Sequence, residues 1–245
     1  DRTYLFTWSD KQLTEQQIDS FNQLIKRREQ GEPIAHIVGV REFWSLELNV
    51  NPSTLIPRAD TEILVESALG FAHSSSEAHP IGLDLGTGTG AIALALASEL
   101  PKWQWLGVDL IKEAVELASQ NAVKNNIKNC FFKQSSWFEN VPEKKYDLIV
   151  SNPPYIDPTD QHLNQGDVRF EPLSALISDD SGLADIKLII DHAKSYLKPK
   201  APLFIEHGYD QANEVQSIFS QLNYENIKTF QDLSGNDRVS VGHLR

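Results

Sequence analysis

A predicted strand over 81–85 leads into a loop with glycine at every second position and then into a helical pattern. The glycines of this glycine loop are Gly86, Gly88 and Gly90. Glycines at a strand-to-helix turn let main-chain N–H groups and the helix N-terminus face a ligand with no Cβ in the way. Asp109 ends the next predicted strand, where a carboxylate can accept hydrogen bonds from ribose hydroxyls. The sequence therefore predicts an α/β unit with a nucleoside-cofactor site.

Strand and helix patterns alternate throughout the chain beyond residue 80. Strands are predicted over 81–85, 105–109, 130–133, 146–151, 201–206 and around Val239 and Val241, with helices over 91–100, 113–125, 183–197 and 211–222. Such alternation is typical of a mostly parallel sheet covered by helices on both faces.

The hydrophobic period upstream of this unit changes from helical to alternating. Thr14 and Gln17 have the spacing of a capping box at the start of an amphipathic helix. Apolar and polar residues then alternate over 44–50, which predicts a half-buried strand, with 34–38 as its expected hairpin partner. Thr61 is the expected N-cap of the following helix.

The acidic residue Asp84 helps to choose between cofactors. Gly86, Gly88 and Ala91 also satisfy the dinucleotide pattern G-x-G-x-x-A, so a nicotinamide-dependent dehydrogenase is one alternative. That enzyme would need an acid–base constellation that we do not find in the sequence. A carboxylate just before the loop would repel a pyrophosphate but suits the cationic amino-acid end of S-adenosylmethionine. We therefore favour S-adenosylmethionine.

A second motif, an Asn-Pro-Pro-Tyr tetrapeptide, directly follows the strand predicted over 146–151. Its residues are Asn152, Pro153, Pro154 and Tyr155. In an open parallel sheet, ligands bind outside the carboxyl ends of the strands, so we expect the tetrapeptide and the glycine loop to share one crevice. The Asn152 side-chain oxygen and the Pro153 carbonyl can accept both N–H bonds of a substrate –NH2 group. They would aim its nitrogen lone pair at a methyl donor, with Tyr155 as a flat wall.

The charge balance argues against a protein that binds nucleic acid stably. There are 34 acidic and 22 basic residues, a formal net charge of -12. An adenine-N6 DNA or RNA methyltransferase is still an alternative, because an exocyclic amine presents the same geometry to the tetrapeptide. The single cysteine, Cys130, fits a reducing compartment, and no apolar run could span a bilayer, so we expect a cytoplasmic protein. The seven histidines show no metal-ligand spacing, so no metal site is expected.

The sequence resembles the PrmC/HemK family of bacterial peptide chain release factor glutamine N5-methyltransferases over essentially its whole length. Besides the glycine loop and the tetrapeptide, the likeness includes Glu-Pro-Ile-Ala-His at 32–36, Gly-Val-Arg-Glu-Phe-Trp at 39–44, Leu-Ile-Pro-Arg-Ala-Asp-Thr-Glu at 55–62 and Arg-Phe-Glu-Pro at 169–172. Other methyltransferases share the glycine loop and the tetrapeptide. The block over 32–62 is much more specific to this family.

The resemblance implies a Rossmann-like class I S-adenosylmethionine-dependent methyltransferase fold. The expected sheet is mostly parallel and seven-stranded, with helices on both faces, and a small helix plus β-hairpin segment precedes it. We expect a remnant of a helical N-terminal domain over 1–33, a β-hairpin connector over 34–57 and a catalytic domain over 58–245. The implied reaction methylates the glutamine side-chain amide in the Gly-Gly-Gln motif of class I peptide chain release factors, with S-adenosylhomocysteine as the other product.

The resemblance also implies roles for single residues. The tetrapeptide would hold the glutamine, and Ser136 stands where many relatives carry an acidic residue. The implied cofactor contacts are Asp84, Gly86, Thr87, Gly88, Thr89, Gly90, Asp109, Trp137 and Asn152. On its own pattern Trp137 is as typical of a core aromatic as of an adenine contact. The residues expected to shape the substrate site are Arg58, Arg169, Phe170 and Glu171, and Arg169 and Glu171 form either a structural ion pair or part of a lid.

Overall fold

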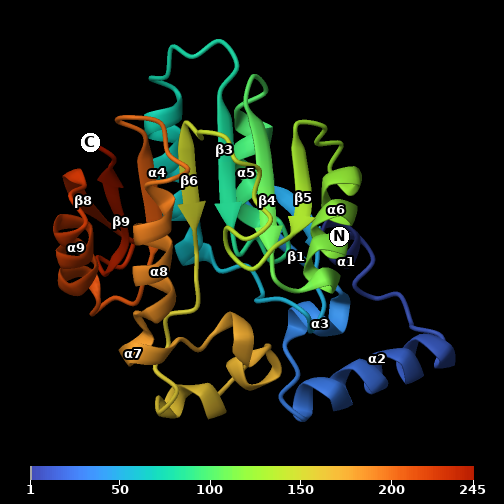
Figure 1. Ribbon diagram of the computed structural model, residues 1–245. Coiled ribbons are helices and arrows are strands. Elements are labelled where there is room, and N and C mark those ends of the chain that lie inside the picture. The colour runs from blue at the N-terminus through green and yellow to red at the C-terminus, as the bar shows by residue number, and fades with distance from the viewer. Residues whose placement is uncertain (1) are drawn as a thin grey trace.

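The structure, a computed structural model, describes residues 2–245 and is built around one large sheet (Figure 1). The sheet has seven strands in the order β5-β4-β3-β6-β7-β9-β8. They are β3 (Ile81–Leu85), β4 (Gln104–Asp109), β5 (Cys130–Gln134), β6 (Leu148–Ser151), β7 (Pro202–Glu206), β8 (Glu225–Gln231) and β9 (Asp237–His243). All pairs from β5 to β7 are parallel, and β9 is antiparallel to both its neighbours. The predicted mostly parallel, seven-stranded sheet is confirmed.

Helices cover both faces of the sheet, as the alternation predicts. One apolar cluster joins the sheet to α4 (Glu62–Ala72) and α5 (Ala91–Glu99), and a second joins it to α8 (Ala184–Ala193) and α9 (Ala212–Gln221). Successive residues of a strand enter opposite clusters: Leu148 and Val150 belong to the first, and Ile149 to the second. Helix α6 (Lys112–Lys124) packs against β4 and β5.

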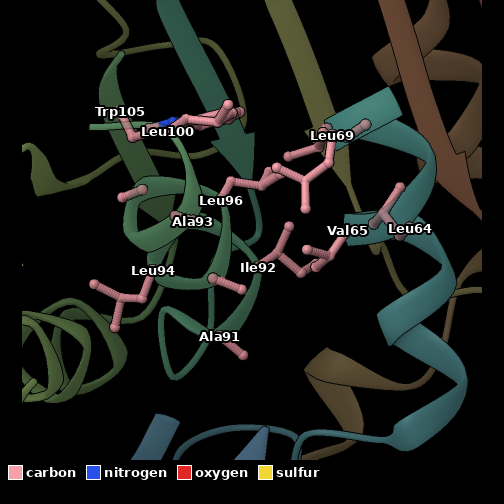
Figure 2. Packing of buried hydrophobic residues seen from close by; sticks show 14 of the residues in the cluster. Leu64, Val65, Leu69, Ala91, Ile92, Ala93, Leu94, Leu96, Leu100 and Trp105 are labelled. Atoms are coloured by element: carbon pink, nitrogen blue, oxygen red, sulfur yellow. The ribbon is translucent and has the colours of Figure 1, made fainter. Parts of the chain in front are cut away.

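Helix α5 is the most deeply buried helix segment beside the site. Every residue from Ala91 to Ala97 is buried. Figure 2 shows Val65 and Leu69 of α4 lying toward Ile92 and Leu96 of α5. Because this helix is apolar on all sides and enclosed, its N-terminus and the glycine loop before it are held in place by the core.

The strand order places a topological switch point between β3 and β6. The chain proceeds from β3 outward through β4 to β5, and then returns to place β6 on the other side of β3. The glycine loop follows β3 and the tetrapeptide follows β6, so both leave the same edge of the sheet at the point where the strand order reverses. Ligands of open α/β sheets bind in this position.

The predicted hairpin exists, but its first strand was placed wrongly. Residues predicted to pair with the strand form helix α3 (Ile34–Val38) instead. The hairpin consists of β1 (Val40–Phe43) and β2 (Leu46–Asn49), joined by Trp44 and Ser45. Both turn residues have left-handed φ angles, 51° and 62°, as a two-residue type I′ hairpin turn requires.

The remaining elements refine the sequence prediction at several points. The capping box at Thr14 is confirmed: the helix α2 (Glu15–Glu29) starts after it, and Thr14 and Gln17 exchange both hydrogen bonds. Helix α1 (Arg2–Thr7) and strand β8 had not been predicted. Thr61 ends the short helix η1 (Ala59–Thr61) and precedes α4 as expected, but its side chain does not cap that helix.

A long segment between β6 and α8 folds into short helices. They are η2 (Gln161–Asn164), η3 (Val168–Phe170), η4 (Leu173–Ala175) and α7 (Asp179–Gly182). In Figure 1 this segment lies below the carboxyl edge of the sheet, on the same side as α2 and α3. Two contacts join it to the end of α2: Arg28 pairs with Asp167 at 2.9 Å, and Arg169 donates to the Gln30 carbonyl at 3.0 Å. It therefore links the N-terminal helices to the site.

Candidate functional site

A cavity of about 210 Å³ opens where the glycine loop and the tetrapeptide meet. The structure thus brings the two sequence motifs together in one crevice, as predicted. Of the residues expected to contact the cofactor, those in its lining are Gly86, Thr87, Gly88, Thr89, Asp109, Trp137 and Asn152. Apolar side chains of Leu110 and Ile111 line it as well.

The backbone of the glycine loop is open toward this cavity. Gly86 and Gly88 have φ angles of 71° and 54°, a region that L side chains rarely adopt. A Cβ at Gly88 would meet only the Thr54 Cβ, at 3.9 Å, whereas a Cβ at Gly86 would lie 3.3 Å from the Trp137 ring. The absence of side chains here leaves room for a ligand directly against the main chain.

The Asp109 carboxylate is held at the cavity by two backbone donors. The N–H of Gly88 donates to its Oδ2 at 2.8 Å, and the N–H of Ile111 donates to its Oδ1 at 2.9 Å. Burial raises the pKa of Asp109, and these hydrogen bonds oppose the rise. The carboxylate is therefore fixed in position and retains acceptor capacity for a ligand hydroxyl group.

Two of the expected cofactor contacts lie outside the cavity lining. Asp84 is fully buried beneath the loop, where the Thr87 hydroxyl donates to its Oδ2 at 2.6 Å. Burial raises the pKa of Asp84 to about 7. Gly90, at the end of the loop, faces Ala118 of α6 and Phe132 of β5. Both residues lie behind the loop, and Asp84 is linked to the cavity lining by the Thr87 hydroxyl.

Trp137 forms one wall of the cavity and is held there by a residue that the sequence did not indicate. Its indole Nε1 donates to Asp185 Oδ1, in the first turn of α8, at 3.2 Å. Both residues line the cavity, and Ser136 lies beside them. The position of the half-buried ring against Gly86 favours the ligand-facing role of Trp137 over a purely internal one.

A second cavity, of about 350 Å³, adjoins the first on the other side of the tetrapeptide. Arg58 and Asn152 are among the residues that line both cavities, while Pro153 and Tyr155 line the second and Pro154 the first. Asn152 thus stands in the wall that the two cavities share.

The side chains of the tetrapeptide have buried polar partners. Asn152 Nδ2 donates to the Thr61 hydroxyl at 3.2 Å. The Tyr155 hydroxyl donates to Glu206 Oε1 at 3.4 Å, and its burial raises the pKa of Tyr155 well above the ordinary range. Neither Thr61 as a partner nor Glu206 could be recognised from a sequence pattern, because both are distant in sequence from the tetrapeptide.

The four residues expected to shape the substrate site divide into two groups. Arg58 lines both cavities and pairs with Glu171, whose side chain is fully buried. Arg169 contacts the Gln30 carbonyl and the Phe170 ring instead of Glu171. Arg169 and Phe170 both lie against Gly31, just beyond the end of α2. Burial raises the pKa of Glu171, and the charge of Arg58 opposes that rise.

Known protein families and curated proteins match this chain over most of its length. A family described as a methyltransferase domain matches residues 78–239, and the PrmC N-terminal domain family matches residues 1–39. The release factor glutamine methyltransferase of Vibrio cholerae serotype O1 is 54% identical over 245 residues, which is 100% of this chain and 85% of that protein. The enzyme of the same name from Escherichia coli K12 is 50% identical over 98% of this chain and 86% of its own.

The chain belongs to the release factor glutamine methyltransferase family. This confirms the resemblance drawn from the sequence. A solved methyltransferase from Pyrococcus furiosus has the same fold, with a TM-score of 0.59 at 19% identity over 91% of this chain and 98% of that one. Within residues 2–245, no helix is long and apolar enough to cross a membrane, and no group of three or more His, Cys, Asp or Glu side chains is arranged to hold a metal ion.

Proposed function

We propose that this protein transfers a methyl group from S-adenosylmethionine to the side-chain amide nitrogen of the glutamine in the Gly-Gly-Gln motif of class I release factors. One observation carries the proposal: Asn152 stands in the wall between the two cavities. An acceptor in that position can hold an amide whose nitrogen faces the first cavity. Membership of the release factor glutamine methyltransferase family supports the choice of substrate.

The residues of the first cavity fit S-adenosylmethionine. The open backbone at Gly86 and Gly88 leaves space for the amino-acid end, and the fixed Asp109 carboxylate suits two ribose hydroxyls. The Trp137 ring and the apolar side chains of Leu110 and Ile111 suit a planar base. The buried acidic group of Asp84 provides negative potential beneath the loop, which favours a cationic ligand.

The second cavity is where we place the glutamine. Its lining combines Tyr155, whose ring is a flat wall, with Arg58 and Pro153. The cavity is large enough for one side chain but presents no stacked aromatic pair of the kind that holds an extruded base, among the residues that line it. We place the rest of the protein substrate outside this cavity, near the segment that carries Arg169 and Phe170.

The chemistry requires an amide nitrogen to act as a nucleophile, although its lone pair is delocalised into the carbonyl. When bound, S-adenosylmethionine supplies an electrophilic methyl group on a sulfonium. The Asn152 Oδ1 and the Pro153 carbonyl accept the two N–H bonds of the glutamine amide and so direct its lone pair. They also stabilise the positive charge that develops on nitrogen as the new N–CH3 bond forms and the S–CH3 bond breaks. The nitrogen then releases one of its two protons to water, which leaves the neutral N-methyl amide and S-adenosylhomocysteine. No covalent bond to the protein is needed.

Methyl transfer can be measured directly with S-adenosylmethionine labelled on its methyl group. We expect a class I release factor to acquire label, and a release factor with alanine in place of the motif glutamine to acquire none. Adenine-containing DNA, offered in parallel, should remain unlabelled. Label on DNA alone, or undiminished label on the alanine-substituted release factor, would overturn the proposed substrate.

The role of Asn152 has its own test in the same assay. Asn152→Ala should lower kcat by roughly 100-fold or more, the scale seen when one preorganised hydrogen-bonding group is removed from an active site. Binding of S-adenosylmethionine, measured by calorimetry, should change little. Asn213→Ala, an exposed position on α9, is the matched control and should retain full activity. Normal transfer by Asn152→Ala would disprove this account of nitrogen activation.

A further inference from the structure

A buried carboxyl group with no assigned role lies directly behind the tetrapeptide. Glu206 ends β7, next to β6, and its side chain is almost completely enclosed, with 2% of the residue exposed. Its Oε1 accepts the hydrogen bond from Tyr155, and its Oε2 has no hydrogen-bond partner of good geometry among the described residues. A buried carboxyl group that lacks hydrogen-bond partners lowers the stability of the folded state. Its position beside the site therefore suggests a functional role.

Thr61 connects this carboxyl group to Asn152. Its hydroxyl accepts from Asn152 Nδ2 at 3.2 Å and faces the Glu206 carboxyl group, where it acts as a donor of imperfect geometry that lowers the pKa of Glu206. Thr61 itself is buried, with 4% of the residue exposed. Both ends of the tetrapeptide are thus connected to Glu206. Tyr155 contacts it directly, and Asn152 is linked to it through Thr61.

The direction of these hydrogen bonds follows from elementary chemistry. An ionised carboxylate can only accept, and a hydroxyl has a single proton to donate. If Glu206 is ionised, Thr61 donates to it, and only the hydroxyl lone pairs then face Asn152. Asn152 must therefore present its NH2 group to Thr61, which leaves the Oδ1 atom on the opposite side of the amide.

We infer that Thr61 and Glu206 are positioning residues that keep the Asn152 amide turned so that its Oδ1 faces the substrate nitrogen. The inference rests on the proposed function. A neutral Glu206 can itself donate a proton, which allows Thr61 to donate to Asn152 and the amide to turn over. The substrate would then meet an NH2 group instead of an acceptor, and its nitrogen would no longer be held for transfer.

The surroundings of Glu206 make its protonation relevant near neutral pH. The charged and titratable groups that face it are Arg238 from β9, Asp60 from η1 and Tyr155. Burial raises the pKa of Glu206 to about 7, and the Thr61 hydrogen bond and the Arg238 charge oppose the rise. The ionised form, which sets the required orientation, therefore predominates above about pH 7.

The first test removes only the hydroxyl group that connects the two residues. Thr61→Val should lower kcat for release factor methylation by about 10-fold or more, while affinity for S-adenosylmethionine changes less than about 2-fold. Thr61→Ser, which keeps the hydroxyl, should restore kcat to within about 3-fold. Thr229→Val, on the edge strand β8, also removes a bonded hydroxyl and is the matched control with normal kcat.

The second test follows kcat/KM for the release factor from pH 5.5 to 8.5 at saturating S-adenosylmethionine. Saturation keeps any effect of Asp84 on cofactor binding out of the profile. For the wild type, kcat/KM should fall by about 10-fold per pH unit below about 7. Glu206→Gln cannot ionise and, like the neutral carboxyl group, can donate to Thr61 at every pH. The acid limb should therefore disappear, and kcat/KM should stay near the low value that the wild type has at acid pH. Such a change in the pH profile would not follow from a loss of stability alone.

The outcomes separate this inference from the proposed function. If the wild type fails to methylate the release factor, the proposed function fails. If the wild type transfers methyl groups and folded Thr61→Val does so with unchanged kcat, the positioning role is wrong while the function stands. Persistence of the acid limb in Glu206→Gln would likewise overturn the role of Glu206.

Discussion

The guanidinium group of Arg58 pairs with the fully buried carboxylate of Glu171, 113 positions later in the chain. The same carboxylate accepts from the backbone N–H of Ile56 at 2.8 Å. Because Arg58 lines both cavities, this pair ties the segment between β6 and α8 to the residues around the site. An ion pair between Arg169 and Glu171, one of the two alternatives that the sequence leaves open, is not formed, because Glu171 pairs with Arg58.

Arg58→Ala should loosen this segment. It leaves Glu171 buried with one backbone donor, and after allowing for the exposure of the Arg58 side chain we expect a loss of about 1–3 kcal/mol in unfolding free energy. Urea unfolding measures the loss, and hydrogen exchange should rise over residues 156–180. Arg28→Ala breaks an exposed pair with Asp167 and should cost about 0.5 kcal/mol or less. Equal effects of the two substitutions would contradict this account.

Asn121→Ala tests how the hairpin is attached to the glycine loop. The buried Asn121 amide donates to the carbonyls of Asn49 and Thr89 and accepts from the Asn49 N–H. Removing it leaves these backbone groups without partners, so we expect a loss of about 2–4 kcal/mol. Ser119→Ala, an exposed position on the same helix, should change stability by less than about 0.5 kcal/mol in the same unfolding experiment. A loss below 1 kcal/mol in Asn121→Ala would argue that water replaces the amide.

The elements that sequence periodicity predicts well are those enclosed by the core. Strand β3 agrees with its predicted bounds, and α5 differs from its prediction by one residue. The glycine loop marks the boundary between them, and the apolar residues of α5 run unbroken from Ala91 to Ala97. Strand β8 was missed because only Ile227 and Phe230 are apolar in it, and a register shift interrupts the alternation at the sheet edge.

Helix α3 shows how a short apolar run misleads. Ile34, Ile37 and Val38 have the helical spacing i, i+3, i+4, but five residues before a strand fit a hairpin arm equally well on pattern alone. What decides the structure is local: Gly39 adopts a left-handed conformation, and its N–H donates to the Ala35 carbonyl, which ends the helix.

The site could be predicted where its residues are contiguous and not where they meet only in the fold. The glycine loop and the tetrapeptide carry their chemistry in short strings. Thr61 reaches Asn152 across 91 positions, and Glu206 reaches Tyr155 across 51. A single Thr or Glu has no spacing pattern that identifies its buried partner. These contacts can therefore be found only in the three-dimensional structure.

Trp137→Ala should weaken binding of S-adenosylmethionine by about 10- to 100-fold, the range for loss of one aromatic wall of a ligand site. The ring packs against the glycine loop and is held by Asp185, so Asp185→Ala should weaken binding to a smaller extent, through a less ordered ring. Calorimetric titration measures both. Trp8→Ala, at an exposed position in the N-terminal part, should leave affinity unchanged. Unaltered affinity in Trp137→Ala would show that the ring serves only the core.

Asp84→Asn should make the stability of the ligand-free protein less dependent on pH. Burial raises the pKa of Asp84 from 3.8 to about 7, so the folded state binds a proton that the unfolded state has released between these values. Its contribution to stability is therefore fully present below about pH 3.8 and is lost as pH rises through about 7.

The neutral amide of Asp84→Asn avoids this loss, so the variant should gain on the order of 2–4 kcal/mol relative to the wild type between pH 5 and pH 8.5. Unfolding in urea at a series of pH values measures the difference. Glu66→Gln, which removes an exposed carboxylate on α4, should follow the wild type throughout. The unfolding free energy of Asp84→Asn could instead vary with pH as steeply as that of Glu66→Gln. In that case the carboxyl group of Asp84 is already ionised at low pH in the folded protein, and its charge stabilises the loop.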